Sequence, residues 1–339
     1  MKAVRITVLI EHLLSLFAAT PDDVRLPSLE TFLSRARFTP GQLDDSDAVR
    51  YKLFGYDPSD SVPVAALTRL AGRYGRETSE LSLEDRSYLL RADPVTLRPD
   101  LSRVVMTGFG YADYEAQEQQ EVGETIRAVL LAEGMNIASE QDGRWTIALE
   151  RALEFTFPSL QQALGMDAAE VLPDHPQARS WRRLMNEVQM ALYACPVNQR
   201  RREQGRQEIN SVWFWGGGGL PEPTTSLVER AVYSDHPVSK GLALLNSCRL
   251  DGLEKLADGL PGGDQATDLM IDWTPQQGDL LSQLRQVESL AAVLLDRISH
   301  NKMQAGIVVG NGSAWHVSRV STLRFWQRKI PVRHWVPKE

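Results

Sequence analysis

A run of glycines and a cluster of arginines are the residues whose types and spacing could bind an anion. The glycines at 216–219 directly follow the apolar run Ser211–Trp215, and the arginines just upstream are Arg200, Arg201, Arg202 and Arg206. Glycine backbone N–H groups can converge on an anion, and arginine donates charge-assisted hydrogen bonds to phosphate or carboxylate. The alternative is a tight turn after a strand, because the run matches neither common glycine-rich phosphate-binding motif.

The residues that usually hold metals do not show ligand spacing. The two cysteines, Cys195 and Cys248, are far apart and outside any C-x-x-C pattern, which indicates a reducing compartment and excludes a cysteine-rich zinc site. The six histidines show neither H-x-x-x-H nor H-x-H spacing. Asp235-His236 precedes Pro237 at a predicted helix start, where Asp is a common N-cap. We therefore predict no metal site, no cofactor and no catalytic residue.

Composition limits the possible function classes. The chain has 339 residues, enough for two domains or for one domain with a large insertion. Its net charge of −7 argues against a broad nucleic-acid-binding face, which would be basic. Glu11 and His12 interrupt the apolar start of the chain, so we interpret Val4–Ile10 as a buried strand rather than a signal peptide or a membrane span. We expect a cytoplasmic protein that neither enters a membrane nor binds nucleic acid.

Apolar strands alternate with amphipathic helices near both ends of the chain. This pattern predicts an α/β fold with a mostly parallel sheet and helices on both faces. We expect residues 1–80 and 200–339 to form this core, with Val4–Ile10 and Ser211–Trp215 in one sheet. Hairpins and long helices interrupt the rhythm at 81–199, which we interpret as an inserted domain. The predicted helices in the two parts lie at 26–36, 45–54, 64–71, 114–133, 179–195, 226–231, 239–246 and 280–298, and the hairpin turns at Gln141-Asp142-Gly143 and Asn311-Gly312.

The block Asn198-x-x-Arg201-x-x-x-Gly205, followed by Asn210, Trp213, Trp215 and the glycines, resembles a known family. It is similar to a proteobacterial phosphoglycerate-mutase-like family of regulatory proteins of the RpfE type. It is more distantly similar to the archaeal-type cofactor-independent phosphoglycerate mutases. Three other segments agree in order and spacing, and the resemblance extends from about Pro27 to Trp326. These segments are 88–95, 181–190 and Arg324-Phe325-Trp326.

This resemblance implies an alkaline-phosphatase-like fold, in which a doubly wound sheet carries a smaller inserted α+β domain. Active members hold two divalent metals with aspartates and histidines at the carboxyl ends of core strands, and a serine or threonine between the metals is the nucleophile. This sequence departs from that pattern. Glu11-His12 stands where active mutases have Asp-Gly, and Gly310-Asn311-Gly312-Ser313 lacks the late Asp-His ligands.

The anion-binding residues are the part of the family pattern that this sequence keeps. The predicted ligand-binding residues are Arg91, Asn198, Arg201, Asn210, Gly216, Gly217 and Gly218. We expect them to hold a small anionic ligand, a class that includes phosphorylated molecules. Structural alternatives stay open: Arg91 could pair with Asp93, and the asparagines could cap backbone groups of the loop.

Three functional hypotheses follow. The first is a degenerate, metal-free relative of the mutases that binds a small anionic ligand or a protein partner in a regulatory role. The second is an active metal-dependent phosphomutase or phosphatase, of the 2,3-bisphosphoglycerate-independent kind, with an altered metal site at Glu11. The third is a purely structural interaction protein. The missing ligands favour the first hypothesis, so we expect a protein without enzymatic activity.

Overall fold

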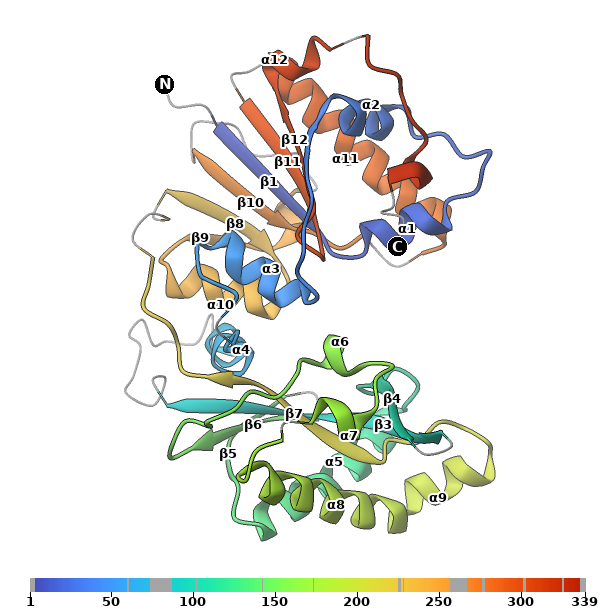
Figure 1. Cartoon of the computed structure of the whole chain (residues 1–339), viewed down its shortest axis with the longest axis vertical. Helices are drawn as coiled ribbons and strands as arrows, with labels where there is room; N and C mark the ends of the chain where they lie inside the picture. The colour runs from blue at the N-terminus through green and yellow to red at the C-terminus, as the bar shows by residue number, and fades with distance from the viewer. Residues whose placement is uncertain are drawn as a thin grey trace. The chain divides into compact units, whose positions relative to one another are not determined.

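The structure is a computed structural model of the whole chain (Figure 1). It describes residues 4–59, 61–73, 87–100, 103–141, 143–172, 174–224, 227, 229–256, 267–275, 278–300, 303–324 and 326–335. Asp142 of the first predicted hairpin turn and Phe325 of the terminal segment lie outside these residues. The chain divides into two compact units, Met1–Tyr56 with Pro223–Glu339 and Asp57–Glu222.

The first unit contains a seven-stranded, mostly parallel sheet in the order β2-β12-β11-β1-β10-β8-β9. Strand β1 lies at its centre, parallel to both β10 and β11. β8 is parallel to β10 and β9, whereas β12 and β2 are antiparallel additions at one edge. The strands are β1 Val4–Ile10, β2 Arg37–Thr39, β8 Arg230–Ser234, β9 Arg249–Asp251, β10 Asp268–Asp272, β11 Met303–Val309 and β12 Ala314–Ser318.

Helices pack on both faces of this sheet, which explains why β1 is a continuous apolar run. One face is covered by α1 (Leu13–Ala19), α2 (Pro27–Arg35) and α11 (Leu280–His300), whose buried side chains join those of Ile6 and Val8 in one core. The other face carries α3 (Ser46–Leu53) and α10 (Pro237–Leu245), and there Leu9 packs against α3. The prediction of a mostly parallel sheet with helices on both faces is confirmed for this unit.

Short segments complete the first unit. They are α12 (Arg319–Thr322) and two single-turn 3₁₀ helices, η3 (Leu253–Leu256) and η4 (Val332–Trp335). The predicted hairpin between β11 and β12 is confirmed, and Gly312 has φ +80° at its turn. The predicted helix at 226–231 was wrong for its last two residues, because β8 begins at Arg230. Residues 225, 226 and 228 lie outside the described part of the chain.

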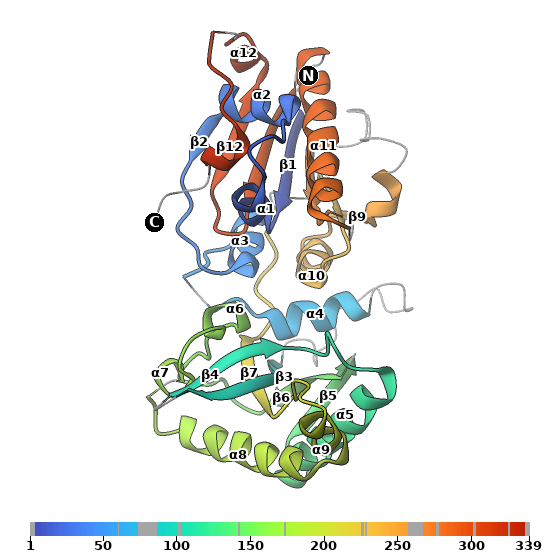
Figure 2. The same cartoon turned by 90° about the vertical axis from the view of Figure 1, so that its right-hand side faces the viewer.

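The second unit is built on an antiparallel five-stranded sheet around one long strand, β3 (Tyr88–Asp100). β3 pairs with β4 and β6 along one side and with β7 along the other. Figure 2 shows α4 on one face of this sheet and α5, α8 and α9 on the other. The elements are α4 Val64–Gly72, β4 Arg103–Phe109, α5 Ala116–Ala132, β5 Asn136–Gln141, β6 Arg144–Leu149, α6 Leu160–Ala163, α7 Ala168–Val171, α8 Ala178–Ala194, α9 Pro196–Glu203 and β7 Ser211–Gly218.

Strand β7 overturns one prediction about the sheets. We expected Ser211–Trp215 to share a sheet with Val4–Ile10, but β7 pairs with β3 of the second unit instead. The strand also continues through three of the four glycines, ending at Gly218. The compact units accordingly differ from the predicted boundaries, since α4 and β7 belong to the unit that spans 57–222. A run of buried apolar residues indicates a strand, but it does not identify the partner strand.

Candidate functional site

Acidic and polar side chains gather at the carboxyl edge of the parallel strands in the first unit. Glu11 directly follows β1, and Asp272 is the last residue of β10. His236 lies two residues beyond β8, where its backbone N–H donates to the hydroxyl of Ser234 at 2.9 Å. The carboxyl ends of parallel strands lie along one edge of the sheet, so residues distant in sequence converge there.

Arg50 occupies the centre of this acidic group. Its side chain is 1% exposed, and all five of its N–H groups have partners. Nε donates to Asp272 Oδ2 at 2.8 Å, and Nη2 donates to Asp272 Oδ1 at 3.4 Å and to Glu11 Oε2 at 2.8 Å. Nη1 donates to Ser46 Oγ at 3.0 Å and to Asp47 Oδ1 at 3.2 Å. The guanidinium is therefore fully satisfied by protein groups.

Helix α3 positions Arg50 and two of its partners. Asp45 caps the helix by accepting the backbone N–H of Asp47 at 2.7 Å. Ser46 and Asp47 lie four and three residues before Arg50, so the helical turn brings their side chains beside the guanidinium. On the far side of the cluster, Ser239 of α10 donates its hydroxyl to Asp272 Oδ2 at 2.6 Å. The cluster therefore links helices α3 and α10 to the ends of β1 and β10.

The buried charges shift one another's pKa values. Burial alone would raise the pKa of Glu11, but the neighbouring Arg50 guanidinium lowers it to about 2. For Arg50, the carboxylates of Asp272 and Asp47 outweigh burial and raise the pKa. Burial raises the pKa of Asp47 to about 7 despite the attraction of Arg50. Burial and Arg50 together lower the pKa of His236 to about 4, so its imidazole is neutral at pH 7.

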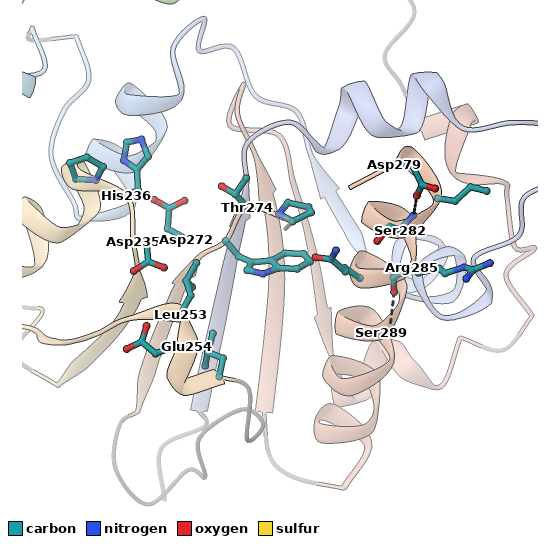
Figure 3. A pocket seen from close by; sticks show the side chains of 16 residues that line it. Asp235, His236, Leu253, Glu254, Asp272, Thr274, Asp279, Ser282, Arg285 and Ser289 are labelled. Atoms are coloured by element: carbon teal, nitrogen blue, oxygen red, sulfur yellow. Dashed lines mark hydrogen bonds between the residues drawn. The ribbon is translucent and has the colours of Figure 1, made fainter. Parts of the chain in front are cut away.

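A cavity of about 1380 Å³ opens beside this cluster (Figure 3). Asp235, His236 and Asp272 lie together on one side of it, and Asp279, directly before α11, lines it with Ser282 and Arg285 of the first turns of that helix. The imidazole Nδ1 of His236 is buried without a hydrogen-bond partner in the described structure. Within the described ranges, no group of three or more His, Cys, Asp or Glu side chains is arranged to hold a metal ion.

The predicted cap at Asp235 was wrong. His236 is the N-cap of α10, and Asp235 precedes the helix and lies 3.5 Å from the ammonium of Lys240. The side chain of Asp235 is 60% exposed, so this pair is a solvated one.

The predicted ligand-binding residues all lie in the second unit, where Arg201, Asn198 and Asn210 hydrogen-bond to protein groups. Arg201 is fully buried, and its guanidinium donates to Gln207 O at 2.7 Å, Asp113 O at 3.0 Å, Glu118 Oε2 at 2.8 Å and Asp113 Oδ2 at 3.0 Å. Its guanidinium carbon also lies 3.7 Å from the centre of the Tyr114 ring. These contacts leave Arg201 buried against protein groups and not open to a ligand.

The two asparagines hold backbone segments together. Asn198 is fully buried and donates its amide to Leu192 O at 3.0 Å and Ile209 O at 2.7 Å. Asn210 accepts the backbone N–H of Leu97 at 2.8 Å and donates to Leu97 O at 2.7 Å, as a paired strand residue would. Both asparagines therefore hydrogen-bond to backbone groups, as the structural alternative for them supposed.

Arg91 and the glycines lie together, where β3 and β7 face helix α4. Arg91 donates to Asp93 Oδ1 at 2.7 Å and to the hydroxyl of Thr68 of α4 at 3.2 Å. The contact with Asp93 is the ion pair considered as the structural alternative for Arg91. Gly216 has φ +61°, and a Cβ there would lie 2.8 Å from the Cβ of Val64. A Cβ at Gly217 would meet Tyr88, and one at Gly218 would meet Pro63. The glycines thus allow α4 to approach β7 closely.

Comparisons with known proteins relate the chain to one group of enzymes. No protein-family model matches it. A probable 2,3-bisphosphoglycerate-independent phosphoglycerate mutase of Geobacter sulfurreducens is 27% identical over 206 residues, which cover 58% of this chain and 50% of that protein. The 2,3-bisphosphoglycerate-independent phosphoglycerate mutase of Methanosarcina mazei is 25% identical over 244 residues, covering 65% of this chain and 56% of the enzyme. The chain is distantly homologous to these mutases. It spans about half the length of the curated relatives it matches.

One solved structure shows the same fold, and a second superposes less well. The PH0037 protein of Pyrococcus horikoshii superposes with a TM-score of 0.51 at 14% identity, over 93% of this chain and 87% of that protein. A cofactor-independent phosphoglycerate mutase of Thermoplasma acidophilum gives a TM-score of 0.44 at 16% identity, over 94% of this chain and 90% of that one. The prediction of an α/β fold is confirmed.

Sequence reasoning missed the Arg50 cluster. One signal was present, because Asp272 ends an apolar strand and Glu11 follows another, and such positions converge at one sheet edge. A second signal was the spacing of Ser46, Asp47 and Arg50 on one helical turn. Neither signal shows that a single arginine would join both strand ends.

Proposed function

We propose that this chain is a degenerate phosphoglycerate-mutase-like protein that acts by binding, in a regulatory role, and not by metal-dependent phosphoryl transfer. The observation that supports the proposal is Arg50. Its guanidinium donates hydrogen bonds to the carboxyl groups of Glu11, Asp47 and Asp272, at the sheet edge where the family resemblance implies metal ligands. Arg50 thus places one positive charge of the chain itself among the acidic groups of this edge.

The chemistry of a guanidinium differs from that of a divalent metal. A bound metal polarises a phosphoryl oxygen and lowers the pKa of a bound water or hydroxyl. The Arg50 guanidinium has all five donors engaged, and arginine stays protonated at neutral pH. It therefore offers neither an open coordination position nor a proton acceptor. Moving it aside would leave buried carboxylates without a counter-ion, which is costly.

The altered-site hypothesis places a metal on Glu11. In the structure that carboxylate is 17% exposed and accepts a 2.8 Å hydrogen bond from Arg50. A metal would have to compete with this charge-assisted bond. The arrangement therefore favours the binding hypothesis over the altered metal site.

Location and partners belong to the same proposal. Among the described residues, no helix combines the length and apolar character that a membrane crossing needs. We propose a cytoplasmic protein whose partner is a small anionic ligand or another protein, with the second unit inserted into the first. The narrower resemblance to regulatory proteins of the RpfE type stays part of this proposal.

The decisive experiment measures interconversion of 2- and 3-phosphoglycerate by the purified chain with added Mn²⁺. An active 2,3-bisphosphoglycerate-independent mutase measured in parallel shows that the assay works. We expect no activity above a blank without protein. Activity that disappears in Glu11→Ala would establish the altered-site hypothesis and overturn this proposal.

A further inference from the structure

A second cavity lies in the first unit, over the face of the sheet that carries α3. Its volume is about 820 Å³. Five arginine and lysine side chains line it, from β1, β2, α3, β8 and the segment after α12. They are Arg5, Arg37, Lys52, Arg230 and Arg324.

This cavity exists because α3 covers only part of the sheet face. Side chains at positions two apart in a strand point to the same face, so Arg5, Thr7 and Leu9 of β1 share one. Leu9 packs against α3, whereas Arg5 and Thr7 line the cavity. The sheet is therefore apolar towards the carboxyl ends of its strands and polar over the neighbouring stretch.

The strand register places polar side chains from β1, β12 and β2 in one row across the sheet. Thr7 pairs with Gly306, Gly306 with His316, and His316 with Arg37. A Cβ at Gly306 would lie 2.6 Å from the imidazole Nδ1 of His316. Because Gly306 has no side chain, the imidazole of His316 packs directly against its backbone, and both residues line the cavity.

Positive side chains dominate the described lining of the cavity. No Asp or Glu occurs among its lining residues in the described ranges. Arg230 is paired with Asp268 at 2.7 Å. The other four cations have no ion-pair partner within the part of the chain that the structure describes. In a chain whose net charge is −7, these four cations, unpaired among the described residues, form a concentrated positive field around one cavity.

The positive charges around the cavity affect the pKa of His316. Burial lowers the pKa of its imidazole, and the positive charges of Arg5 and Arg37 lower it further. A neutral imidazole can donate one hydrogen bond and accept another. Hydroxyl donors also line the cavity, among them Thr7, Thr39 and Ser318. Cations and neutral donors together are the groups that bind phosphate oxygens.

We propose that this cavity binds a small molecule that carries two or more phosphate groups. A phosphate monoester carries about −1.5 to −2 charges at pH 7, so about two of them balance the four unpaired cations. The volume lies within the range of small-molecule sites, roughly 300–1,000 Å³. The acidic charge of the whole chain opposes the broad backbone contact that a nucleic acid would need.

This inference rests on the proposal that the chain acts by binding, and it assigns the binding to residues outside the Arg50 cluster. The two proposals fail separately. Mutase activity with Mn²⁺ would overturn the proposed function and leave the cavity untouched. A chain without activity that also fails to bind polyphosphate would overturn the inference alone.

The test is isothermal titration calorimetry with sodium tripolyphosphate at constant ionic strength. We expect saturable binding to the full chain. Arg5→Gln and Arg37→Gln should each weaken it roughly tenfold to hundredfold, because each removes one charge-assisted contact. The matched control is Arg179→Gln, which removes an exposed arginine of the second unit and should change affinity less than about twofold. The melting temperature of each variant verifies that it is folded.

A second readout depends on His316 alone. A bound polyanion stabilises the imidazolium form, so the pKa of His316 measured by NMR should rise on adding tripolyphosphate. No saturable binding, equal losses in Arg5→Gln and Arg179→Gln, or an unmoved His316 titration would each overturn the inference. Tighter binding of a short single-stranded RNA, with the same dependence on Arg5, would replace it with a nucleic-acid site.

Discussion

Arg50 and Asp272 form a two-bond ion pair beneath the carboxyl edge of the sheet. Nε and Nη2 of the arginine reach the two carboxylate oxygens at 2.8 and 3.4 Å. Both side chains are at most 2% exposed. The pair joins helix α3 to the end of strand β10, across 222 residues of sequence. A pair this deeply buried makes each partner dependent on the other.

Arg50→Ala should destabilise the chain by about 3–5 kcal/mol, because it leaves buried carboxylates without their counter-ion. Urea unfolding of the parent and the variant measures the difference in free energy. Arg179→Ala, an exposed arginine, is the control and should change stability by less than about 0.5 kcal/mol. A loss for Arg50→Ala no larger than the control would contradict the structural role of this cluster.

The same variant should respond to divalent cations. Removing the guanidinium leaves Glu11, Asp47 and Asp272 around the vacated volume, and oxygen ligands of this kind suit Mn²⁺ and Mg²⁺. We expect Mn²⁺ to raise the melting temperature of Arg50→Ala more than that of the parent, since a ligand bound only to the native state stabilises it. Equal shifts in the two proteins would show that Arg50 does not substitute for a metal cation.

Acid should weaken the fold through Glu11. Its pKa is lowered from 4.5 to about 2 in the folded chain, so its stabilising contribution is present above pH 4.5 and is lost as the pH falls towards 2. The shift corresponds to roughly 3 kcal/mol. Chemical denaturation at several pH values should show a shallower acid dependence for Glu11→Gln than for the parent. Parallel curves for the two proteins would contradict this assignment.

Gly216 should be far less tolerant of substitution than Gly205. Both have positive φ, +61° and +66°, but only Gly216 has a close neighbour, the Cβ of Val64. Gly205→Ala should cost about 1–2 kcal/mol for the left-handed backbone alone. Gly216→Ala should cost about 1–3 kcal/mol more, because α4 must move from β7. Thermal or urea unfolding gives both values, and equal costs would mean that α4 does not constrain the glycine.

Arg201 should matter to stability and not to anion binding. Arg201→Ala removes a buried charge opposite Glu118 and Asp113, and we expect a loss of about 3–5 kcal/mol. The neighbouring Arg200→Ala is the control, because the Arg200 side chain is 52% exposed. Where Arg201→Ala still folds, its tripolyphosphate affinity should equal that of the parent. Selective loss of that affinity would restore Arg201 as a ligand residue.

Local patterns predicted most individual elements of this fold. The long amphipathic helices α5, α8 and α11 and the buried strand β1 lie close to where periodicity placed them, because one face or both faces of each must be apolar. The pairing of β7 was missed, since its partner β3 starts more than 100 residues earlier in the chain and apolar content does not encode pairing. The close approach of helix α4 to the glycines of β7 was also missed, because that contact joins segments distant in sequence.

The candidate site was harder to predict than the fold. An arginine on a helix and an acidic residue after a strand are both common in sequences. Each is ordinarily interpreted as a solvent-exposed surface charge. Only the folded structure shows that Glu11, Asp47 and Asp272 all form ion pairs with Arg50 and therefore belong to one site. The positive cavity escaped notice for the same reason, because Arg5, Arg37 and Lys52 are scattered along the sequence.

The cation at the carboxyl edge is tethered to the polypeptide that supplies the carboxylates around it. Each chain carries one such guanidinium because Arg50 is part of the polypeptide, so dilution or dialysis cannot remove this cation. Chelators such as EDTA should therefore leave the folding temperature of the parent unchanged, whereas Arg50→Ala supplemented with Mn²⁺ should lose its gain when a chelator is added. A guanidinium in this position makes the stability of the sheet edge independent of the metal supply around the protein.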